Sequence, residues 1–581
     1  MEYQPFVKPK AEEMSIRPNI GEYDQARQEL DWKSLEGQLD GLPDGGLNIA
    51  YESIDRHCLA DRKDKVAVYW EGDHGESEQY TFGDLQRLTN QFANVLTTLG
   101  VQKGDRVFVF IGRIPELYVA VFGTLKVGAI MGPLFSSFGP DAVLDRLGDS
   151  GAKVLVTSAE LMDTVHKVKD RLPELKHVIV VDRRGRYEGM YQPGETSYVE
   201  ELLKASDEFT AADTSPEDYA VMHYTSGTTG KPKGAVHVHG AILGHYATAQ
   251  WVLDLHDDDI YWCTADPGWV TGTSYGMFGP WSNGISQVVY EGEFRPGGWY
   301  KVIEKYKVTV WYTAPTAVRA LMKIGEHAAE RYDLSSLRHI CSVGEPLNPE
   351  AIVWAQRAFK MPIHDTWWQT ETGCILISNY PALDIRPGSM GKPVPGITAA
   401  VIDDEFNKVG PGEEGNLALK SGWPSMFRTY WRNDDLYQSR FKNSWYITGD
   451  RAYVDKDGYF WFIGRTDDVI NTAGHLVGPF EVESVLLEHP AVAEAGVIGK
   501  PDPDRMEVVK AFVVLKDGYE ASRELERDIS SMARKRLLAL SCPREIDFVD
   551  SLPKTRSGKI MRRIIKAREL GLPEGDLSTL E

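Results

Sequence analysis

The stretch YTSGTTGKPKG, residues Tyr224 to Gly234, is the part of this sequence that most strongly indicates its fold. Its glycines let the backbone come close to a ligand, and its successive N–H groups and hydroxyls can cradle phosphate oxygens. Its two lysines place positive charge where a nucleoside triphosphate carries its negative charge. The sequence therefore predicts a phosphate-binding loop, with candidate residues Thr225, Ser226, Gly227, Thr228, Thr229, Gly230, Lys231 and Lys233.

This loop differs from the Walker A loop, because the G-x-x-x-x-G-K-[ST] spacing is absent. The segments on either side, YAVMHY and GAVHVH, both have the composition of short strands. We therefore expect the loop to join two strands, whereas a Walker lysine opens a helix. The alternative is a Gly/Thr-rich surface turn, which two lysines and four Ser/Thr side chains within eleven residues disfavour.

Length and charge limit the classes of protein to consider. A chain of 581 residues is too long for one ordinary core, so two or more domains are expected. A content of 42% hydrophobic and 26% charged residues is typical of a soluble globular protein. The net charge of −21 argues against a nucleic-acid partner and gives no reason to expect an anionic membrane. Local cations must therefore hold any anionic substrate.

The cysteines and the apolar segments predict a cytoplasmic protein. The five cysteines contain no C-x-x-C pair, which fits neither a zinc site nor a disulfide framework. The N-terminus, MEYQPFVKPKAEE, lacks the apolar core of a signal peptide. The longest apolar stretch, Leu117 to Phe135, is interrupted by Lys126 and by glycines. It predicts a buried helix and strand rather than a membrane span.

Apolar runs alternate with amphipathic segments in the first part of the chain. The runs VFVFIG (Val107 to Gly112) and KVLVTS (Lys153 to Ser158) precede expected helices from about Glu116 and Ala159. The run HVIVVD follows at His177 to Asp182. This alternation predicts an α/β architecture with buried, largely parallel strands.

A domain boundary is expected near Gly464 to Asp468, which divides the chain into residues 1–465 and 466–581. The second part predicts a small α+β domain. Its expected elements are a helix at Phe480 to His489, strands near Ala495 to Ile498 and Val508 to Leu515, a helix at Ser522 to Leu540 and a basic helix from Ile560.

The run DTWWQTETG, Asp365 to Gly373, has the composition of a binding site. Tryptophans can form the wall of a pocket, Thr and Gln can hydrogen-bond a base edge, and Glu371 can bind Mg²⁺ through oxygen. For Trp367, packing in the core is the simpler interpretation.

Three further runs carry candidate residues. YITGD places Asp450 at the expected end of a strand, where a carboxylate can accept the hydroxyls of a ribose. GRTDDVINTAGHLVGP offers Arg465 near the same sugar and Gly474 where a ligand can approach the backbone. In PKTRSGK, Lys559 follows Ser-Gly, a flexible pair that would allow this cation to move. Taken singly, each of these runs is equally typical of an ordinary turn.

In their order along the chain, these runs resemble the AMP-forming acyl-CoA synthetases of the adenylate-forming superfamily. The resemblance extends from about Glu52 to the end, and within the family it is nearest to the acetyl-CoA synthetases, or acetate–CoA ligases. It implies a large N-terminal domain of several subdomains and a small mobile C-terminal domain. It also implies ATP, Mg²⁺ and CoA, with an acyl-adenylate formed from acetate and ATP and then attacked by the thiol of CoA.

The resemblance assigns roles to residues around the nucleotide. Thr225 to Lys233 resemble the phosphate loop, Asp450 and Arg465 the ribose anchors, and Glu371 the Mg²⁺ contact. The expected adenine site consists of Gly344, Glu345, Pro346, Asp365, Thr366, Trp367, Trp368, Gln369 and Thr370.

The resemblance also assigns roles to residues of the small domain. Lys559 matches the lysine that bridges the substrate carboxylate and the α-phosphate during adenylation, and Asp467 matches the hinge. Gly474 and Arg534 match CoA contacts. His489 matches a residue beside a second Mg²⁺, although a histidine that caps a helix end is the commoner interpretation.

The acyl pocket of this family is expected from Val270, Thr271, Val343 and Trp368. An indole fills the volume of several methylenes, so Trp368 is expected to exclude longer acids by its size.

Other functions are considered beside this one. The chain could activate another short acid such as propionate, load an amino acid onto a carrier domain, or sense a nucleotide without catalysis. The chain ends at Glu581, about 22 residues beyond Lys559, which leaves little room for a carrier domain. A non-catalytic relative is expected to lose Lys559 or Asp450, and both are present. The family further implies a lysine acetyltransferase and a deacetylase as partners that act on Lys559.

One position departs from the family pattern. Acetyl-CoA synthetases usually have arginine where this chain has Leu476 in the run Gly474-His475-Leu476. The lysines of the phosphate loop and Mg²⁺ already balance most of the triphosphate charge, so a rim arginine adds little through screened water. We predict that Leu476→Arg lowers the KM for ATP less than tenfold, under ~1.4 kcal/mol of binding, in steady-state kinetics. A larger gain, or collapse of thioester formation, would contradict this interpretation.

Overall fold

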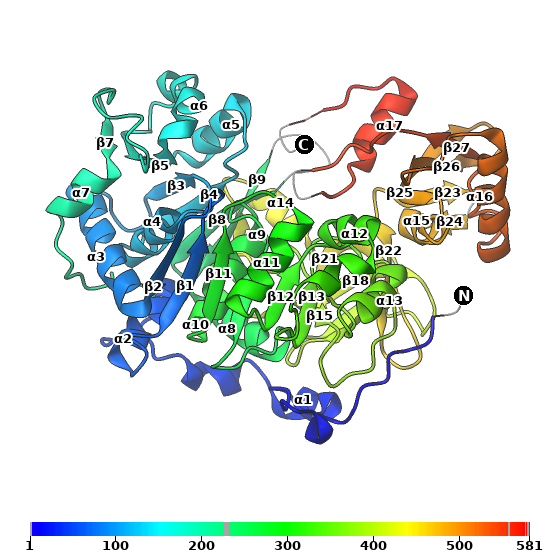
Figure 1. The fold of residues 1–581 in the computed structure, drawn as a ribbon, viewed down its shortest axis with the longest axis horizontal. Coiled ribbons are helices and arrows are strands. Elements are labelled where there is room, and N and C mark those ends of the chain that lie inside the picture. The colour runs from blue at the N-terminus through cyan, green and yellow to red at the C-terminus, as the bar shows by residue number, and fades with distance from the viewer. Residues whose placement is uncertain are drawn as a thin grey trace.

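The computed structural model describes residues 3–225, 232–473, 475–555, 558–575, 577 and 580. Within them lie three β-sheets and their covering helices (Figure 1). The helices are α1 (Tyr23–Glu29), α2 (Arg56–Leu59), α3 (Phe82–Thr98), α4 (Pro115–Lys126), α5 (Pro140–Ser150), α6 (Met162–His166), α7 (Tyr198–Lys204), α8 (Ile242–Trp251), α9 (Val270–Thr273), α10 (Gly279–Ser282), α11 (Pro296–Tyr306), α12 (Pro315–Ile324), α13 (Pro349–Ala358), α14 (Asp434–Ser439), α15 (Pro479–Leu487), α16 (Arg523–Arg536) and α17 (Arg562–Leu570), with a π-helical turn η7 (Ser274–Phe278).

The largest sheet has 14 strands among the described residues, and β20 (Phe441–Lys442) pairs beside its main path. A parallel run from β14 to β1 forms one half, and antiparallel strands extend it on both sides. In spatial order its strands are β17 (Ala399–Ile402), β18 (Gly415–Lys420), β21 (Trp445–Val454), β22 (Phe460–Arg465), β16 (Ser389–Pro393), β15 (Ile377–Ser378), β14 (His364–Trp367), β13 (His339–Ser342), β12 (Val310–Thr313), β10 (Ile260–Cys263), β11 (Ser286–Tyr290), β1 (Val66–Glu71) and β2 (Ser77–Thr81).

The second sheet contains the alternating runs of the N-terminal part. Its strands from β4 to β7 pair in parallel, as predicted for VFVFIG, KVLVTS and HVIVVD. In spatial order they are β19 (Thr429–Tyr430), β9 (Lys233–Val238), β8 (Tyr219–Thr225), β4 (Ile130–Leu134), β3 (Arg106–Phe110), β5 (Val154–Ser158), β6 (His177–Val181) and β7 (Glu195–Ser197).

The two large sheets pack around shared helices. Helix α3 begins at a capping box, in which the Thr81 hydroxyl accepts from the Asp84 N–H and the Asp84 carboxylate accepts from the Thr81 N–H. Helix α4 begins at Pro115 and is buried nearly all round, because both helices lie in the main core between the two sheets. Helices α5 and α6 cover the outer face of the second sheet, and α11 to α13 cover that of the largest sheet. The layers predicted as α/β are thereby confirmed.

The small C-terminal domain has its own sheet and its own core. Five strands pair in it: β24 (His475–Val477), β23 (Ile470–Thr472), β26 (Met506–Leu515), β25 (Val492–Asp502) and β27 (Glu545–Phe548). Helices α15 and α16 cover this sheet. Figure 1 shows α16 on the side of the domain that faces away from the large domain, while α17 lies nearer to it.

Two boundary predictions differ from the structure. The helix expected to reach Leu540 ends at Arg536, because Leu537 turns inward into the core of the small domain. The strand expected to end at Asp450 continues to Val454, where it pairs with β22. Asp450 therefore lies inside an antiparallel pair, beside an irregularity in the register at Arg451.

The N-terminal segment runs along the base of the largest sheet. Phe6 forms a bridge with Ile385, and the Tyr23 hydroxyl donates to the Pro393 carbonyl at 2.7 Å. In the part of the chain that the structure describes, no helix has the length and apolar character needed to cross a membrane.

Candidate functional site

The candidate site lies where the carboxyl ends of three neighbouring parallel strands meet. β12, β13 and β14 lie side by side in parallel, and the chain leaves each of them at the same edge of the sheet. That edge is the usual ligand site of open α/β sheets. The segments that follow β13 and β14 are Val343 to Pro346 and Trp368 to Gly373, both predicted from the sequence.

The predicted phosphate loop connects β8 and β9, which form an antiparallel hairpin with Thr225 opposite Lys233. The prediction that the loop joins two strands is confirmed. Residues 226–231, which include six of the predicted phosphate contacts, lie outside the described residues. Burial lowers the pKa of Lys233, and the positive charges of Arg440 and Arg465 act in the same direction, against Glu371. The ammonium of Lys233 thus belongs to the same electrostatic neighbourhood as Glu371.

Asp450 joins the nucleotide-site residues into one network. Its Oδ2 accepts hydrogen bonds from Trp367 Nε1 at 3.0 Å and from Gln369 Nε2 at 3.1 Å. Its Oδ1 lies 3.4 Å from Arg465 Nε on the neighbouring strand. Burial raises the pKa of Asp450, whereas the charges of Arg465 and Lys559 oppose that rise. The carboxylate thus has one oxygen fixed by neutral donors and the other directed toward cations.

Trp367 has two roles in this network. It packs in a core cluster with 8% of its surface exposed, as the sequence suggested. Its indole N–H nevertheless orients Asp450, since a buried indole usually finds a hydrogen-bond partner. Gln369 is fixed from both ends, because its amide also donates to the Thr448 carbonyl and accepts from the Tyr446 hydroxyl.

Lys559 of the small domain reaches the same cleft. Its side chain keeps contact with solvent at the mouth of the cleft. Loss of hydration between the two domains is the largest cause of its lowered pKa, and the charge of Arg465 adds to it. Asp450 and Asp468 act in the opposite direction. The charges of Arg465 and Asp450, the residues predicted to hold the ribose, thus act on the Lys559 ammonium.

Glu371 is held on the loop after β14. The Tyr430 hydroxyl donates to its Oε1 at 2.7 Å, which fixes the orientation of the carboxylate. In the described part of the chain, no group of three or more His, Cys, Asp or Glu side chains is arranged to hold a metal ion. This arrangement fits Mg²⁺ bound with a nucleotide, because Mg²⁺ commonly takes one or two carboxylates together with substrate phosphates and water.

Of the predicted acyl-pocket residues, Trp368 makes an aromatic contact with the segment that follows Val270 and Thr271. Val270 and Thr271 begin α9, and Tyr275, one turn later, packs edge-on against Trp368 at 5.2 Å. Val343 follows β13 and belongs to the same core cluster as Tyr275. The indole of Trp368 is half-buried beside them.

A directed chain of hydrogen bonds holds the Trp368 indole. Its Nε1–H donates to the Tyr312 hydroxyl at 3.2 Å. Because the Thr366 hydroxyl donates to the Ser342 carbonyl at 2.7 Å, it accepts from Tyr312, at 2.8 Å. The chain ends one residue before Val343, another predicted wall of the pocket. Tyr312 therefore connects Trp368 to the segment next to Val343, two predicted walls of the acyl pocket.

The predicted adenine-site residues divide into two sets. Glu345 lies on the loop after β13, where Arg319 donates to its Oε2 at 2.6 Å and Thr316 contacts its other oxygen. Gly344 and Pro346 flank it, and Gly344 has a φ of 96°, which glycine adopts without strain. Asp365 and Thr366 lie instead inside β14, and burial raises the pKa of Asp365 well above its usual range. Thr370 turns its carbonyl toward His237 Nε2, 2.8 Å away.

Other predicted residues lie apart from this cleft. Arg534 is exposed in the last turn of α16, a helix that Figure 1 shows on the side of the small domain facing away from the large domain. His489 follows α15; its Nδ1 accepts from the Ala491 N–H, and its Nε2 lies 3.2 Å from Asp528. Asp467 lies in the turn after β22 with an exposed carboxylate, and Gly474 lies outside the described residues.

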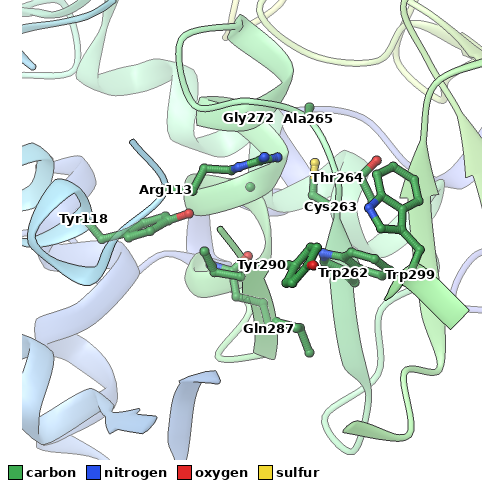
Figure 2. A pocket seen from close by; sticks show the side chains of 13 residues that line it. Arg113, Tyr118, Trp262, Cys263, Thr264, Ala265, Gly272, Gln287, Tyr290 and Trp299 are labelled. Carbon is green, nitrogen blue, oxygen red and sulfur yellow. The ribbon is translucent and has the colours of Figure 1, made fainter. Parts of the chain in front are cut away.

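An enclosed pocket lies behind the acyl-site helix. Figure 2 shows Arg113 and Tyr118 entering it from one side and Cys263 and Thr264 lining another. Its internal volume of about 10 Å³ is enough for about one water molecule. Neither Val343 nor Trp368 lines it, so it adds no space for a longer acid.

Three residues of the site were missed by the sequence analysis: Thr316, Tyr312 and Tyr430. Thr316 and Tyr312 belong to the stretch WYTAPTA, Trp311 to Ala317, in which a strand ends just before a helix that begins with proline. That pattern marks a strand end at which α/β proteins bind ligands, and it was the available signal. Tyr430 gave no comparable signal, because it reaches Glu371 only through tertiary packing.

The fold and the cleft agree with the comparisons to known families. Residues 55–431 match the family described as AMP-binding enzyme, and residues 481–559 match the AMP-binding enzyme C-terminal domain. The chain belongs to the AMP-binding enzyme family.

Among its curated relatives are acetyl-coenzyme A synthetases. That of Bacillus subtilis is 53% identical over 97% of this chain and 98% of its own length. That of Methanothrix thermoacetophila is 43% identical over 92% of this chain and 85% of its own length. A solved structure of the anthranilate CoA ligase AuaEII in complex with anthranoyl-AMP has a TM-score of 0.82 at 34% identity, covering 90% of this chain and 97% of that chain.

Removing the Tyr312 hydroxyl tests the hydrogen-bond chain on Trp368. We predict that Tyr312→Phe lowers the preference for acetate over propionate by about fivefold, since one hydrogen bond contributes ~1 kcal/mol to the indole position. The measurement is the ratio of kcat/KM values for the two acids in ATP–pyrophosphate exchange. Tyr300→Phe is the matched control, because the buried Tyr300 hydroxyl has no hydrogen-bond partner among the described residues. An unchanged ratio in Tyr312→Phe would refute the positioning role.

Proposed function

We propose that this protein is an AMP-forming acetate–CoA ligase that converts acetate, ATP and CoA to acetyl-CoA, AMP and pyrophosphate. Identity of 53% to an acetyl-coenzyme A synthetase over 97% of the chain supports the overall reaction. The structural observation that supports the proposal is the seating of Gly558, the residue before Lys559, on the large domain, where its carbonyl oxygen lies 3.0 Å from Thr316 Oγ1.

The first step forms acetyl-AMP. A carboxylate oxygen of acetate attacks the α-phosphorus of ATP, and the bond to the leaving pyrophosphate oxygen breaks. Lys559 bridges the attacking carboxylate and the α-phosphate, and Lys233 holds charge on the β- and γ-phosphates. Mg²⁺, when bound through Glu371, neutralises phosphate charge. These roles are electrostatic and positional, because phosphoryl transfer requires little covalent chemistry from the protein.

The second step releases the thioester. The sulfur of CoA attacks the acyl carbon, its proton leaves to solvent, and the bond to the AMP oxygen breaks. We expect Arg534, in the last turn of α16, to meet CoA after the small domain turns, because Figure 1 shows α16 on the side of that domain that faces away from the large domain. We place the boundary between residues 1–465 and 466–581, with Asp467 as the hinge. Gly474, Arg534 and, beside a second Mg²⁺, His489 then act in the turned orientation.

The half-reactions provide the main test. Lys559→Ala is expected to reduce acetate-dependent ATP–pyrophosphate exchange by at least ~10²-fold, since removing one preorganised donor typically costs that much. Thioester formation from supplied acetyl-AMP and CoA should remain within about twofold of the original rate, which single-turnover assays measure. Lys566→Ala is the matched control, because Lys566 pairs with Glu507 elsewhere in the small domain. Equal loss of both steps would mean that Lys559 has a structural role.

Substrate size provides the second test. Acetate should be the best substrate, propionate weaker and butyrate poor, because the fixed Trp368 indole fills the space beyond a methyl group. Trp368→Gly should raise the kcat/KM for butyrate relative to acetate by at least ~10-fold, the value of about two methylenes. Equal activity of the unmodified enzyme toward butyrate and acetate would refute the assignment of Trp368 as the residue that limits acid length. A preference for propionate over acetate would identify propionate as the substrate.

A lysine acetyltransferase and a deacetylase are proposed as partners that act on Lys559. The side chain is exposed in the cleft, and acetylation would remove the positive charge that adenylation requires. We also propose a cytoplasmic location, in keeping with five cysteines that are all free thiols.

A further inference from the structure

Thr316, at the start of α12 in the large domain, contacts the backbone that carries Lys559. Its Oγ1 lies 3.0 Å from the carbonyl oxygen of Gly558, within hydrogen-bond distance. The two residues are 242 positions apart in the sequence, so the contact exists only while the small domain is docked as it is here. Gly558 is the residue directly before Lys559 in the chain.

The backbone of Gly558 lies against Thr316 more closely than any other residue type would permit. A Cβ at this position would meet Thr316 Cγ2 at 2.2 Å and Thr316 Oγ1 at 2.6 Å. Gly558 also has a φ of 84°, in the left-handed region that favours glycine. The backbone of Gly558 is thus seated directly on the Thr316 side chain.

The Thr316 hydroxyl has one proton and two acceptors for it. Arg319 donates to Oγ1 at 2.9 Å and, with the same nitrogen, to Glu345 Oε2 at 2.6 Å. With this lone pair occupied, the hydroxyl proton can go either to Glu345 Oε1 or to the Gly558 carbonyl. When Gly558 departs, the proton still has Glu345 as an acceptor. Undocking of the small domain therefore leaves the Thr316 hydroxyl with an acceptor. A donor without an acceptor would cost free energy.

We propose that Thr316 is a positioning residue: its hydroxyl donates to the Gly558 carbonyl and thereby directs Lys559 into the cleft for adenylation. When the small domain leaves, the hydroxyl donates to Glu345 instead, which releases Gly558. This proposal rests on the proposed function, because it assigns Thr316 to the first half-reaction alone.

Beside a ring contact between Phe462 and Phe480, whose centroids lie 6.1 Å apart, other contacts across the domain boundary are polar pairs. Asn348 Nδ2 donates to the Ser484 hydroxyl at 2.9 Å. Lys323 lies 3.3 Å from Glu494, which also pairs with Lys554 at 2.6 Å within the small domain. Such contacts exchange readily with water. The Thr316 contact differs from them because it acts on the residue next to Lys559.

The test compares two substitutions. Thr316→Val replaces the hydroxyl by a methyl group of similar size, and Thr316→Ser retains the hydroxyl. We expect Thr316→Val to lower the kcat of acetate-dependent ATP–pyrophosphate exchange by about five- to tenfold, the effect of one hydrogen bond, with the KM for ATP changed less than about twofold. Thioester formation from acetyl-AMP and CoA should be unaffected, and Thr316→Ser should restore exchange.

Thr157→Val is the matched control. Thr157 is buried in β5, and its hydroxyl donates to the Phe110 carbonyl at 2.8 Å, so this substitution also removes one hydroxyl-to-carbonyl hydrogen bond. It should lower thermal stability without separating the half-reactions. If Thr316→Val fails to fold, Gly558→Ala tests the same contact from the other domain, and it should also impair exchange and leave thioester formation intact.

The outcomes are distinguishable. A raised KM for ATP with unchanged kcat would mean that Thr316 acts on the nucleotide through Glu345, and it would overturn the proposal. Equal loss in both half-reactions, or failure of Thr316→Ser to restore exchange, would overturn it as well. Absence of acetate-dependent exchange in the unmodified enzyme would instead refute the proposed function.

Discussion

The site depends on a buried carboxylate that must remain charged. Asp450 has only 4% of its surface exposed, and burial alone would favour its neutral form. Arg465 from the neighbouring strand and Lys559 from the other domain supply positive charge, while Trp367 and Gln369 supply neutral donors. The bulge-like irregularity at Arg451, the packing of Trp367 and the docking of the small domain all act on this one group. The same carboxylate therefore links the proposed nucleotide site electrostatically to the small domain.

The two domains meet through contacts that suit a movable part. The small domain has a separate sheet and a separate apolar core, so it can change orientation without exposing the core of the large domain. Beside the ring contact of Phe462 with Phe480, the interface contacts named above are single hydrogen bonds and solvent-facing ion pairs, such as Lys323 with Glu494. Each contributes little on its own, and each can be replaced by water. Trp368, a predicted wall of the acyl pocket, is held more firmly, because Tyr312 and Tyr275 fix it inside the large domain.

Sequence patterns predicted the elements with strong local signals. The runs VFVFIG, KVLVTS and HVIVVD became the parallel strands β3, β5 and β6, because continuous apolar runs are buried on both faces. The loop after β8 was placed between strands for the same reason. Element ends were predicted less well. Helix α16 stops at Arg536 because Leu537 enters the core, and β21 passes through Asp450 because β22 offers a pairing partner. Neither partner is visible in the local sequence.

The sequence by itself determined which side chains can act at the site: a glycine- and lysine-rich loop, a tryptophan pair, and Lys559 after the Ser-Gly of PKTRSGK. These are properties of residue type and spacing, which a linear chain displays directly. Only the tertiary structure decided how they act together. Tyr312, Tyr430 and Thr316 reach Trp368, Glu371 and Gly558 across 56, 59 and 242 positions of sequence. Hydrogen bonds depend on distances of about 3 Å and on direction, and such distances between remote residues exist only once the chain has folded.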